Sequence, residues 1–285
     1  MKNLMPSGFL LTGIFTLWML TISCFAQDTM LVRYYDYKNV EANRYYAELL
    51  DMALRETEEQ DGPFKLQAVF PNTTQRDALK RLRVGDGVDV IFTMSSMARS
   101  WVFKAIKFPL TQGYIGLRMI LVTPSNKSRF SKITSVEELR HQKLGQGYDW
   151  PDTQILKDNG LDVVTSHSND SLVEMLFENK IDGFPRGVTE YEHVIHEHPN
   201  HKMVAADGIY LKYPTDMFFY VKKENLSLAR RPEEGLKKGK KDGSFDRIFN
   251  KYMGASIKAA RLEKRHAIIL ENPEYTEMMG NRLKK

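Results

Sequence analysis

The sequence is poor in cysteine, with Cys24 the only one among 285 residues. One thiol cannot form an intrachain disulfide, so the fold must depend on a buried apolar core. Long hydrophobic runs are also lacking. The longest, residues 9–22, has 14 residues, whereas a membrane-spanning helix needs about 20. No repeat of fixed period and no low-complexity stretch interrupts the chain. These absences favour a soluble globular protein over a membrane-spanning or repeat protein.

Sequence motifs of common catalytic and cofactor sites are missing as well. There is no Gly-x-Ser-x-Gly elbow, which argues against Ser95 or Ser96 as a nucleophile, and no His-Glu-x-x-His pair. Gly85-Asp86-Gly87 follows a helical pattern and precedes a strand, so these glycines predict a turn rather than a phosphate-binding loop. The four histidines between His193 and His201 predict a helix end and turn. We therefore expect no metal site, no cofactor and no enzymatic activity.

The formal charge is +5, and part of the excess lies in the basic run Lys237–Lys241. A nucleic-acid site would need aromatic residues among these charges. None is present in the run, so we expect a solvated helix face and no nucleic-acid partner.

The N-terminus has the pattern of a secretory signal peptide. Lys2 precedes the apolar run 9–22, and Cys24-Phe25-Ala26 offers a small-residue cleavage site. We predict a signal peptide over residues 1–26 and a mature chain of 259 residues (285 − 26). Two alternatives stay open: an uncleaved anchor, and lipidation of Cys24, for which the preceding residues are a poor match.

After this segment the chain alternates between strand and helix patterns, which predicts a mostly parallel sheet covered by helices. Strands are expected at 30–34, 66–70 and 88–92. The helix between the first two has apolar residues at i, i+3, i+4 and i+7 (Tyr46, Leu49, Leu50 and Ala53).

A second unit of the same kind follows. A capping box at Ser135 opens a short helix, and strands are expected at 117–122, 143–147, 181–184 and 217–221. Asp149 is the expected N-cap of a helix with Pro151 in its first turn. Later helices are expected to begin at Arg231-Pro232 and at Ser244.

One arginine stands out from this pattern by its position. The strand at 88–92 leads into a polar turn, Thr93 to Ser96, and Arg99 comes three residues later. Open α/β sheets bind ligands at the carboxyl ends of their strands. The planar guanidinium can hold two carboxylate oxygens at once. Arg99 is therefore a candidate anchor for a carboxylate.

Over residues 30–253 the sequence resembles the polar-amino-acid group of extracytoplasmic solute-binding proteins. The resemblance is carried by the order and spacing of Gly-Asp-Gly-Val-Asp-Val at 85–90, Arg99, Phe-Pro-Leu at 108–110, and the segments 133–139 and 242–249. It implies the type II periplasmic-binding fold, an α/β fold in which two lobes are joined by two hinge crossings. The expected division is 27–112 for the first part of lobe 1, 113–215 for lobe 2, and 216–285 for the return to lobe 1 together with the C-terminal helices and tail.

The resemblance also implies a ligand site between the lobes. Arg99 matches the arginine that holds a ligand carboxylate in the family, and Ser96 matches the turn hydroxyl. Tyr37, in the loop after the first strand, takes the place of an aromatic lid. The family has an acidic residue for the ligand's ammonium near Arg186, but here the chain reads Phe-Pro-Arg-Gly. A cation at that point favours a second anionic group instead.

The second lobe adds two candidates of its own. Trp150 and Asp152 lie at the start of a helix, where backbone N–H groups favour an anion. The predicted ligand-binding set is therefore Ser96, Arg99, Tyr37, Trp150, Asp152 and Arg186.

The function implied is capture of a small anionic or zwitterionic, amino-acid-like solute in the periplasm. A monomer would deliver it to an ABC-type permease. Two alternatives stay open: a ligand-sensing partner of a membrane receptor, and a dehydratase-like enzyme on the same fold.

Overall fold

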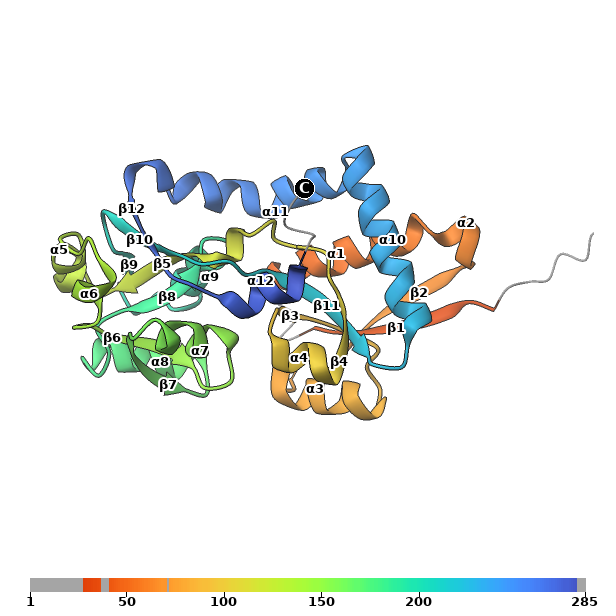
Figure 1. Cartoon of the computed structure of the whole chain (residues 1–285), viewed down its shortest axis with the longest axis horizontal. Helices are drawn as coiled ribbons and strands as arrows, with labels where there is room; N and C mark the ends of the chain where they lie inside the picture. The colour runs from red at the N-terminus through yellow and green to blue at the C-terminus, as the bar shows by residue number, and fades with distance from the viewer. Residues whose placement is uncertain (1–27, 37–40, 71, 281–285) are drawn as a thin grey trace, which may run out of the picture.

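The computed structural model describes residues 28–36, 41–70 and 72–280, and these form two α/β lobes side by side (Figure 1). The predicted signal peptide, including Cys24, and the candidate Tyr37 lie outside the described residues. No helix within the described part of the chain is both long and apolar enough to cross a membrane.

The first lobe is built on a sheet with strand order β2-β1-β3-β11-β4. The pairs β1–β2 and β1–β3 are parallel, as predicted, whereas β11 runs antiparallel to both β3 and β4. The strand β4 was not predicted. The strands of this sheet are β1 (Met30–Tyr35), β2 (Phe64–Val69), β3 (Val90–Met94), β4 (Phe103–Ile106) and β11 (Met217–Lys222). Its nearby helices are α1 (Glu41–Arg55), α2 (Glu58–Asp61), α3 (Gln75–Val84) and α4 (Met97–Val102).

The second lobe contains a mixed sheet of order β12-β10-β5-β8, with β9 also paired to β5, and a separate parallel pair β6–β7. These strands are β5 (Leu117–Val122), β6 (Lys143–Gly147), β7 (Asp162–Ser166), β8 (Phe184–Gly187), β9 (Val204–Ala205), β10 (Ile209–Lys212) and β12 (His266–Ile269). Its helices are α5 (Lys127–Phe130), α6 (Val136–Leu139), α7 (Pro151–Asp158), α8 (Asn169–Phe177) and α9 (Tyr191–Glu197).

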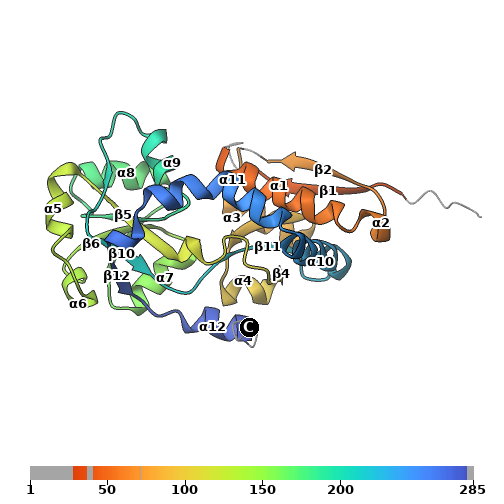
Figure 2. The ribbon, with the colours of Figure 1, turned by 90° about the horizontal axis from the view of Figure 1, so that it is seen from above.

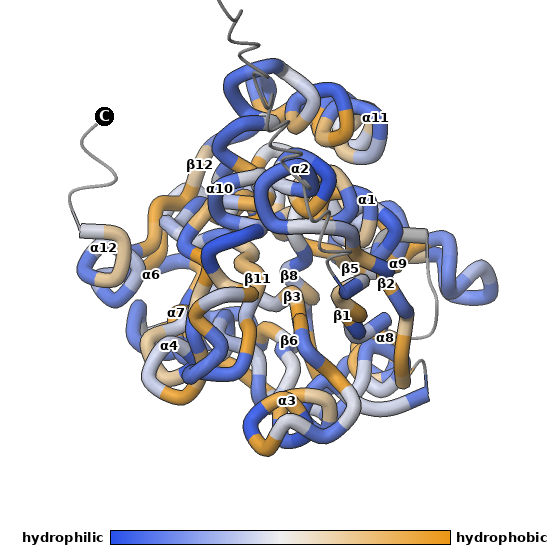
Figure 3. The backbone as a smooth tube through the Cα atoms, turned by 90° about the vertical axis from the view of Figure 1, so that its right-hand side faces the viewer, coloured by the Kyte–Doolittle hydropathy of each residue, from blue (hydrophilic) through white to orange (hydrophobic). Residues whose placement is uncertain are grey.

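The core of the first lobe lies on both faces of its sheet. Successive side chains of a strand point to opposite faces, and β11 has apolar residues on both. Phe219 packs in the cluster that includes α1 and α10 (Leu226–Asp242), and Phe218 packs with α3 and α12 (Pro273–Met279). Seen end-on, the hydrophobic residues of β3 and β11 lie inside the ring of helices (Figure 3). Both faces of this sheet are therefore covered.

The helix predicted to begin at Arg231-Pro232 begins earlier, since α10 spans Leu226–Asp242 and contains Pro232 in its interior. The Asn225 side chain caps it by accepting from the Leu228 N–H at 3.2 Å. Arg231 is buried, and its guanidinium donates to the carbonyls of Leu54 and Gly62. These tertiary bonds hold α10 against α1 and offset the backbone bond that proline cannot make.

The chain passes between the lobes at four places in the described residues. Two are the predicted hinge crossings, at 107–116 and 213–216. The third is α11 (Ser244–Ala259), which begins on the first lobe and ends on the second (Figure 2). The fourth leads from β12 back to α12 (Pro273–Met279) on the first lobe. Within the predicted segment 216–285, β12 is a strand that was not predicted, and it pairs with β10 of the second lobe.

Candidate functional site

The turn after β3 places Arg99 at the boundary between the lobes. Ser96 is the N-cap of α4, and its hydroxyl accepts from the Arg99 N–H at 3.2 Å. The Ser95 N–H donates to the carbonyl of Asp216, in a hinge crossing, at 2.8 Å. The polar turn thus ends the strand, starts the helix and fixes the arginine in the first helical turn.

The Arg99 guanidinium has neutral acceptors from both lobes. It donates to the Met94 carbonyl at 2.7 Å and to the Gln75 carboxamide at 3.2 Å, and it reaches the Asp149 carbonyl of the second lobe at 3.4 Å. No carboxylate in the described residues lies within ion-pair distance of it. Burial lowers the pKa of this guanidinium below its usual value, but an arginine still keeps its charge. The site therefore carries a half-buried positive charge that lacks an anionic partner among these residues.

Facing Arg99, the second lobe presents the loop before α7. Its N-cap is Trp150, and no side chain caps this helix. The prediction of Asp149 as the cap is wrong, because the Asp149 carboxylate points to Arg76 of the first lobe at 3.5 Å. The Trp150 ring covers Gly147, where a Cβ would overlap the indole. A glycine at this point is therefore needed for the tryptophan to lie flat against β6.

Asp152 is buried and already has two partners. The Arg118 guanidinium and the Tyr213 hydroxyl both donate to its carboxylate. Arg118 is 2% exposed and was missed in the sequence. An arginine within an apolar strand is a usable signal, because a buried guanidinium requires an acid nearby. Asp152 therefore holds the interior of the second lobe together.

Arg186 lies beside these residues in a row of alternating charges. Its guanidinium packs over the Trp150 ring at 4.7 Å and lies 2.9 Å from the Glu190 carboxylate, which is 3.6 Å from Arg118. We call Arg186, Glu190, Arg118 and Asp152 the charge row. Glu190 was also missed, because Arg186 lies in strand β8 and Glu190 is the N-cap of α9, so the helical i,i+4 ion-pair spacing gives no signal for this pair.

Glu190 lies close to the position where the resemblance places an acid. A Cβ at Gly187 would be 3.3 Å from Glu190 Oε2, so the missing side chain at Gly187 leaves room for this carboxylate. Oε2 is buried and receives no hydrogen bond of good geometry from the described residues. The cation at Arg186 is thus neutralised locally by an acid four residues later.

A cavity of about 360 Å³ brings three of the predicted residues together. Ser96 and Arg99 line it from the first lobe and Trp150 from the second, and Asn272 and Tyr275 of the C-terminal segment close another side. Asp152 and Arg186 do not line this cavity and instead lie in the charge row behind Trp150.

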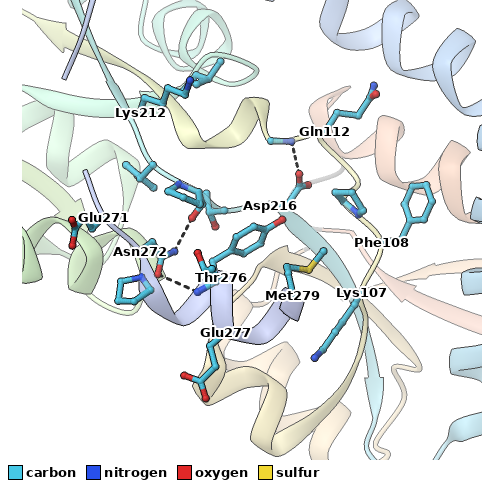
Figure 4. A pocket seen from close by; sticks show the side chains of 18 of the residues that line it. Lys107, Phe108, Gln112, Lys212, Asp216, Glu271, Asn272, Thr276, Glu277 and Met279 are labelled. Carbon is cyan, nitrogen blue, oxygen red and sulfur yellow. Dashed lines mark hydrogen bonds between the residues drawn. The ribbon is translucent and has the colours of Figure 1, made fainter. Parts of the chain in front are cut away.

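A larger hollow of about 1780 Å³ lies on the hinge. It is lined by the two hinge crossings, the ends of α10 and α11, and residues 269–279 (Figure 4).

Three of the four histidines between His193 and His201 are paired with acids on the second lobe. His193 lies 3.2 Å from Glu197, His198 lies 3.1 Å from Asp170, and His201 contacts Glu174 at 3.5 Å. Within the described ranges, no group of three or more His, Cys, Asp or Glu side chains is placed to hold a metal.

The sequence matches no protein-family model and no curated protein, but the fold matches solved structures. An ancestral arginine-binding protein bound to glutamine aligns with a TM-score of 0.58 at 17% identity, over 80% of this chain and 100% of its own. The probable amino-acid ABC transporter extracellular-binding protein ytmK from Bacillus subtilis aligns with a TM-score of 0.60 at 14% identity, over 80% and 99%.

A third structure is the ancestral amino acid-binding protein AncCDT-1, a precursor of cyclohexadienyl dehydratase. It aligns with a TM-score of 0.57 at 16% identity, over 78% of this chain and 95% of its own. The chain therefore has the fold of type II periplasmic-binding proteins, which confirms the predicted fold class. Its structural matches include substrate-binding proteins of amino-acid ABC transporters.

Proposed function

We propose that this protein is an extracytoplasmic solute-binding protein that holds a small carboxylate-bearing solute between its two lobes. The observation that carries the proposal is the half-buried Arg99 charge at the lobe boundary, whose acceptors in the described residues are all neutral. A ligand carboxylate would supply the missing anion and form a charge-assisted, bidentate pair. The fold supports this proposal, because its solved relatives include amino-acid-binding proteins.

An amino-acid-like ligand fits the second lobe better than a dicarboxylate. Glu190 balances Arg186, and Asp152 balances Arg118, so the charge row is neutral as a whole. The Oε2 atom of Glu190 is buried and accepts no hydrogen bond of good geometry from the described residues. An ammonium group that reached past Trp150 would supply a donor to it. Trp150 would then form a flat wall beside the ligand, with Arg186 stacked on the far side of its ring.

A thermal-shift screen of amino acids, dicarboxylates and small peptides tests the proposal directly. We expect Arg99→Ala to abolish the ligand-induced rise in melting temperature while the ligand-free melting temperature changes by only a few degrees. Arg83→Ala, at an exposed position near the end of α3, is the matched control and should respond like the parent chain. An undiminished response in Arg99→Ala would contradict the anchor role.

Two further variants distinguish the ligand classes. Glu190→Gln should weaken the response to amino acids, because the amide cannot balance an ammonium. Arg186→Ala should weaken the response to dicarboxylates if the second lobe binds an anion. Loss of the amino-acid response in Glu190→Gln, with a normal dicarboxylate response, would support the zwitterion. A normal amino-acid response in Glu190→Gln, together with a lost dicarboxylate response in Arg186→Ala, would assign the site to dicarboxylates.

Location outside the cytoplasm and delivery to a membrane permease belong to the same proposal. They are supported by the N-terminal pattern and by the structural matches to transporter binding proteins.

Acid dehydration is a second candidate because AncCDT-1, a precursor of a dehydratase, is among the structural matches. Incubating the purified protein with every acid that raises its melting temperature, followed by mass spectrometry, separates the two functions. Loss of water from any of these acids would favour the enzyme.

A further inference from the structure

The C-terminal segment 266–279 runs from the second lobe back to the first, and we call it the strap. Its first part is β12, which adds a parallel strand to β10 at the edge of the second sheet. The register runs from Ile209↔His266 to Lys212↔Ile269.

The second part of the strap is α12, which docks on the first lobe. Tyr275, Met278 and Met279 are each 6% exposed and belong to the core cluster of Ala78 and Phe218. The Tyr275 and Phe218 rings lie 6.3 Å apart. Lys107 also donates its ammonium to the Met278 carbonyl at 2.7 Å. The helix is thus attached to the first lobe by apolar packing and by a hydrogen bond.

Between these two anchors the strap has only residues 270–272, and they too are held. The Asn159 side chain of the second lobe bonds both backbone groups of Glu271, each at 2.9 Å. Asn272 donates to the Pro214 carbonyl in a hinge crossing at 2.8 Å, and its own oxygen caps α12. These contacts bring the link against the hinge, beside the larger hollow (Figure 4).

The length of this link limits how far the lobes can move apart. An extended chain spans at most about 3.3–3.6 Å per residue, so three residues provide roughly 10 Å in all. If the lobes separate further than residues 270–272 can stretch, either β12 must unpair from β10 or the buried side chains of α12 must move into water. Both events expose apolar or hydrogen-bonding groups and therefore cost free energy.

We infer that the strap restrains the separation of the lobes, so that this chain opens less widely than its two hinge crossings alone would allow. The restraint acts beside the candidate site, because Asn272, Tyr275 and Met278 line the cavity that contains Arg99 and Trp150. It is a property of the ligand-free chain, so it holds whether or not the proposed function is correct.

Pulsed electron–electron double resonance, which measures distances between two spin labels, tests the inference on the full chain without a ligand. Spin labels are placed at Arg83→Cys on the first lobe and Lys157→Cys on the second, both exposed, in a Cys24→Ser background. We expect one narrow distance distribution in this parent. Tyr275→Ala/Met278→Ala, which undocks α12, should add a population at longer distances.

The matched control is Thr276→Ala/Glu277→Ala, two exposed positions on the same helix, which should leave the distribution unchanged. Identical distributions in the parent and in Tyr275→Ala/Met278→Ala would overturn the inference. If circular dichroism shows that this variant does not fold, Asn159→Ala/Asn272→Ala replaces it. This variant releases the link and removes the Asn272 cap of α12 but keeps the apolar packing of α12, and it should broaden the distribution. A distribution as narrow as the parent's would then be the contradicting result.

Discussion

Three arginines with low exposure have different kinds of partners, and the partners decide what each charge does. Arg118 is balanced by the carboxylate of Asp152 inside the second lobe. Arg231 is surrounded by backbone carbonyls and the Thr57 hydroxyl, and it joins two helices. Arg99 has neutral acceptors from both lobes. Of the three, Arg99 is the one that a bound anion would stabilise most.

The Arg118–Asp152 pair predicts a strong effect of a single substitution. Asp152→Ala leaves the Arg118 guanidinium buried without its acid, and we expect the free energy of unfolding to fall by about 3–5 kcal/mol. Asp149→Ala is the control, because its ion pair with Arg76 is 3.5 Å long and exposed, so a loss below about 1 kcal/mol is expected. Urea unfolding followed by circular dichroism measures both. An equal loss of unfolding free energy in the two variants would show that the buried Arg118–Asp152 pair matters no more to stability than an exposed ion pair.

At the scale of the elements, α1 and α10 lie so close that one glycine is required between them. A Cβ at Gly235 of α10 would overlap the Ala53 carbonyl of α1, which belongs to the backbone and cannot rotate away. Gly254 of α11 also lies inside a helix, but its Cβ would meet only Asn250 at 3.9 Å. Alanine at Gly235 therefore tests the close packing of the two helices, whereas alanine at Gly254 tests helix propensity alone.

We predict opposite signs for alanine at these two glycines. Gly235→Ala forces the two helices apart and should lower the free energy of unfolding by about 1–3 kcal/mol. Gly254→Ala only removes backbone freedom from the unfolded chain, and it should raise the free energy of unfolding by up to about 1 kcal/mol. Thermal unfolding of both variants gives the comparison. A stabilising effect at Gly235 would mean that the α1–α10 contact is looser than described.

Most elements could be predicted from local patterns, and those that were missed depend on tertiary contacts. The apolar strand Leu117–Val122 and the capping box at Ser135 are found where they were predicted. The start of α10 was misplaced because Pro232 is a strong local signal for a helix start, and Arg231 overrides it through bonds to residues far away in sequence. The strand β12 was missed because it is short and its pairing with β10 has no local signature.

For the whole molecule, the sequence predicted the two lobes and the position of Arg99 after β3, but not the other groups that the fold brings together near the lobe boundary. Glu190 and Arg118 are brought together by the strands and helix of the second lobe, and Tyr275 reaches the cavity only through the strap. Such groupings depend on long-range packing rather than on spacing along the chain. Local patterns, capping residues and strand ends along the sequence do not encode them.

The two hinge crossings are themselves tied together by Asp216. Its carboxylate accepts from the Thr111 N–H at 2.6 Å, from the Thr111 hydroxyl at 2.8 Å and from the Gly113 N–H, all in the other crossing. The Met217 N–H of its own strand donates as well, at 2.8 Å. One fully buried side chain thus connects both passages between the lobes (Figure 4).

Burial raises the pKa of Asp216 from 3.8 to about 7 although these donors oppose the shift. The folded chain then binds this proton more tightly than the unfolded chain, so stability falls as pH rises from about 4 to 7. Asp216→Asn removes the titrating group. In this variant the free energy of unfolding should fall less steeply with pH, by up to about 1.4 kcal/mol per pH unit, which is the slope for one proton. Urea unfolding of both proteins across this window measures the slopes. Equal slopes would mean that the carboxylate stays ionised, and that its four donors outweigh the cost of burying the charge.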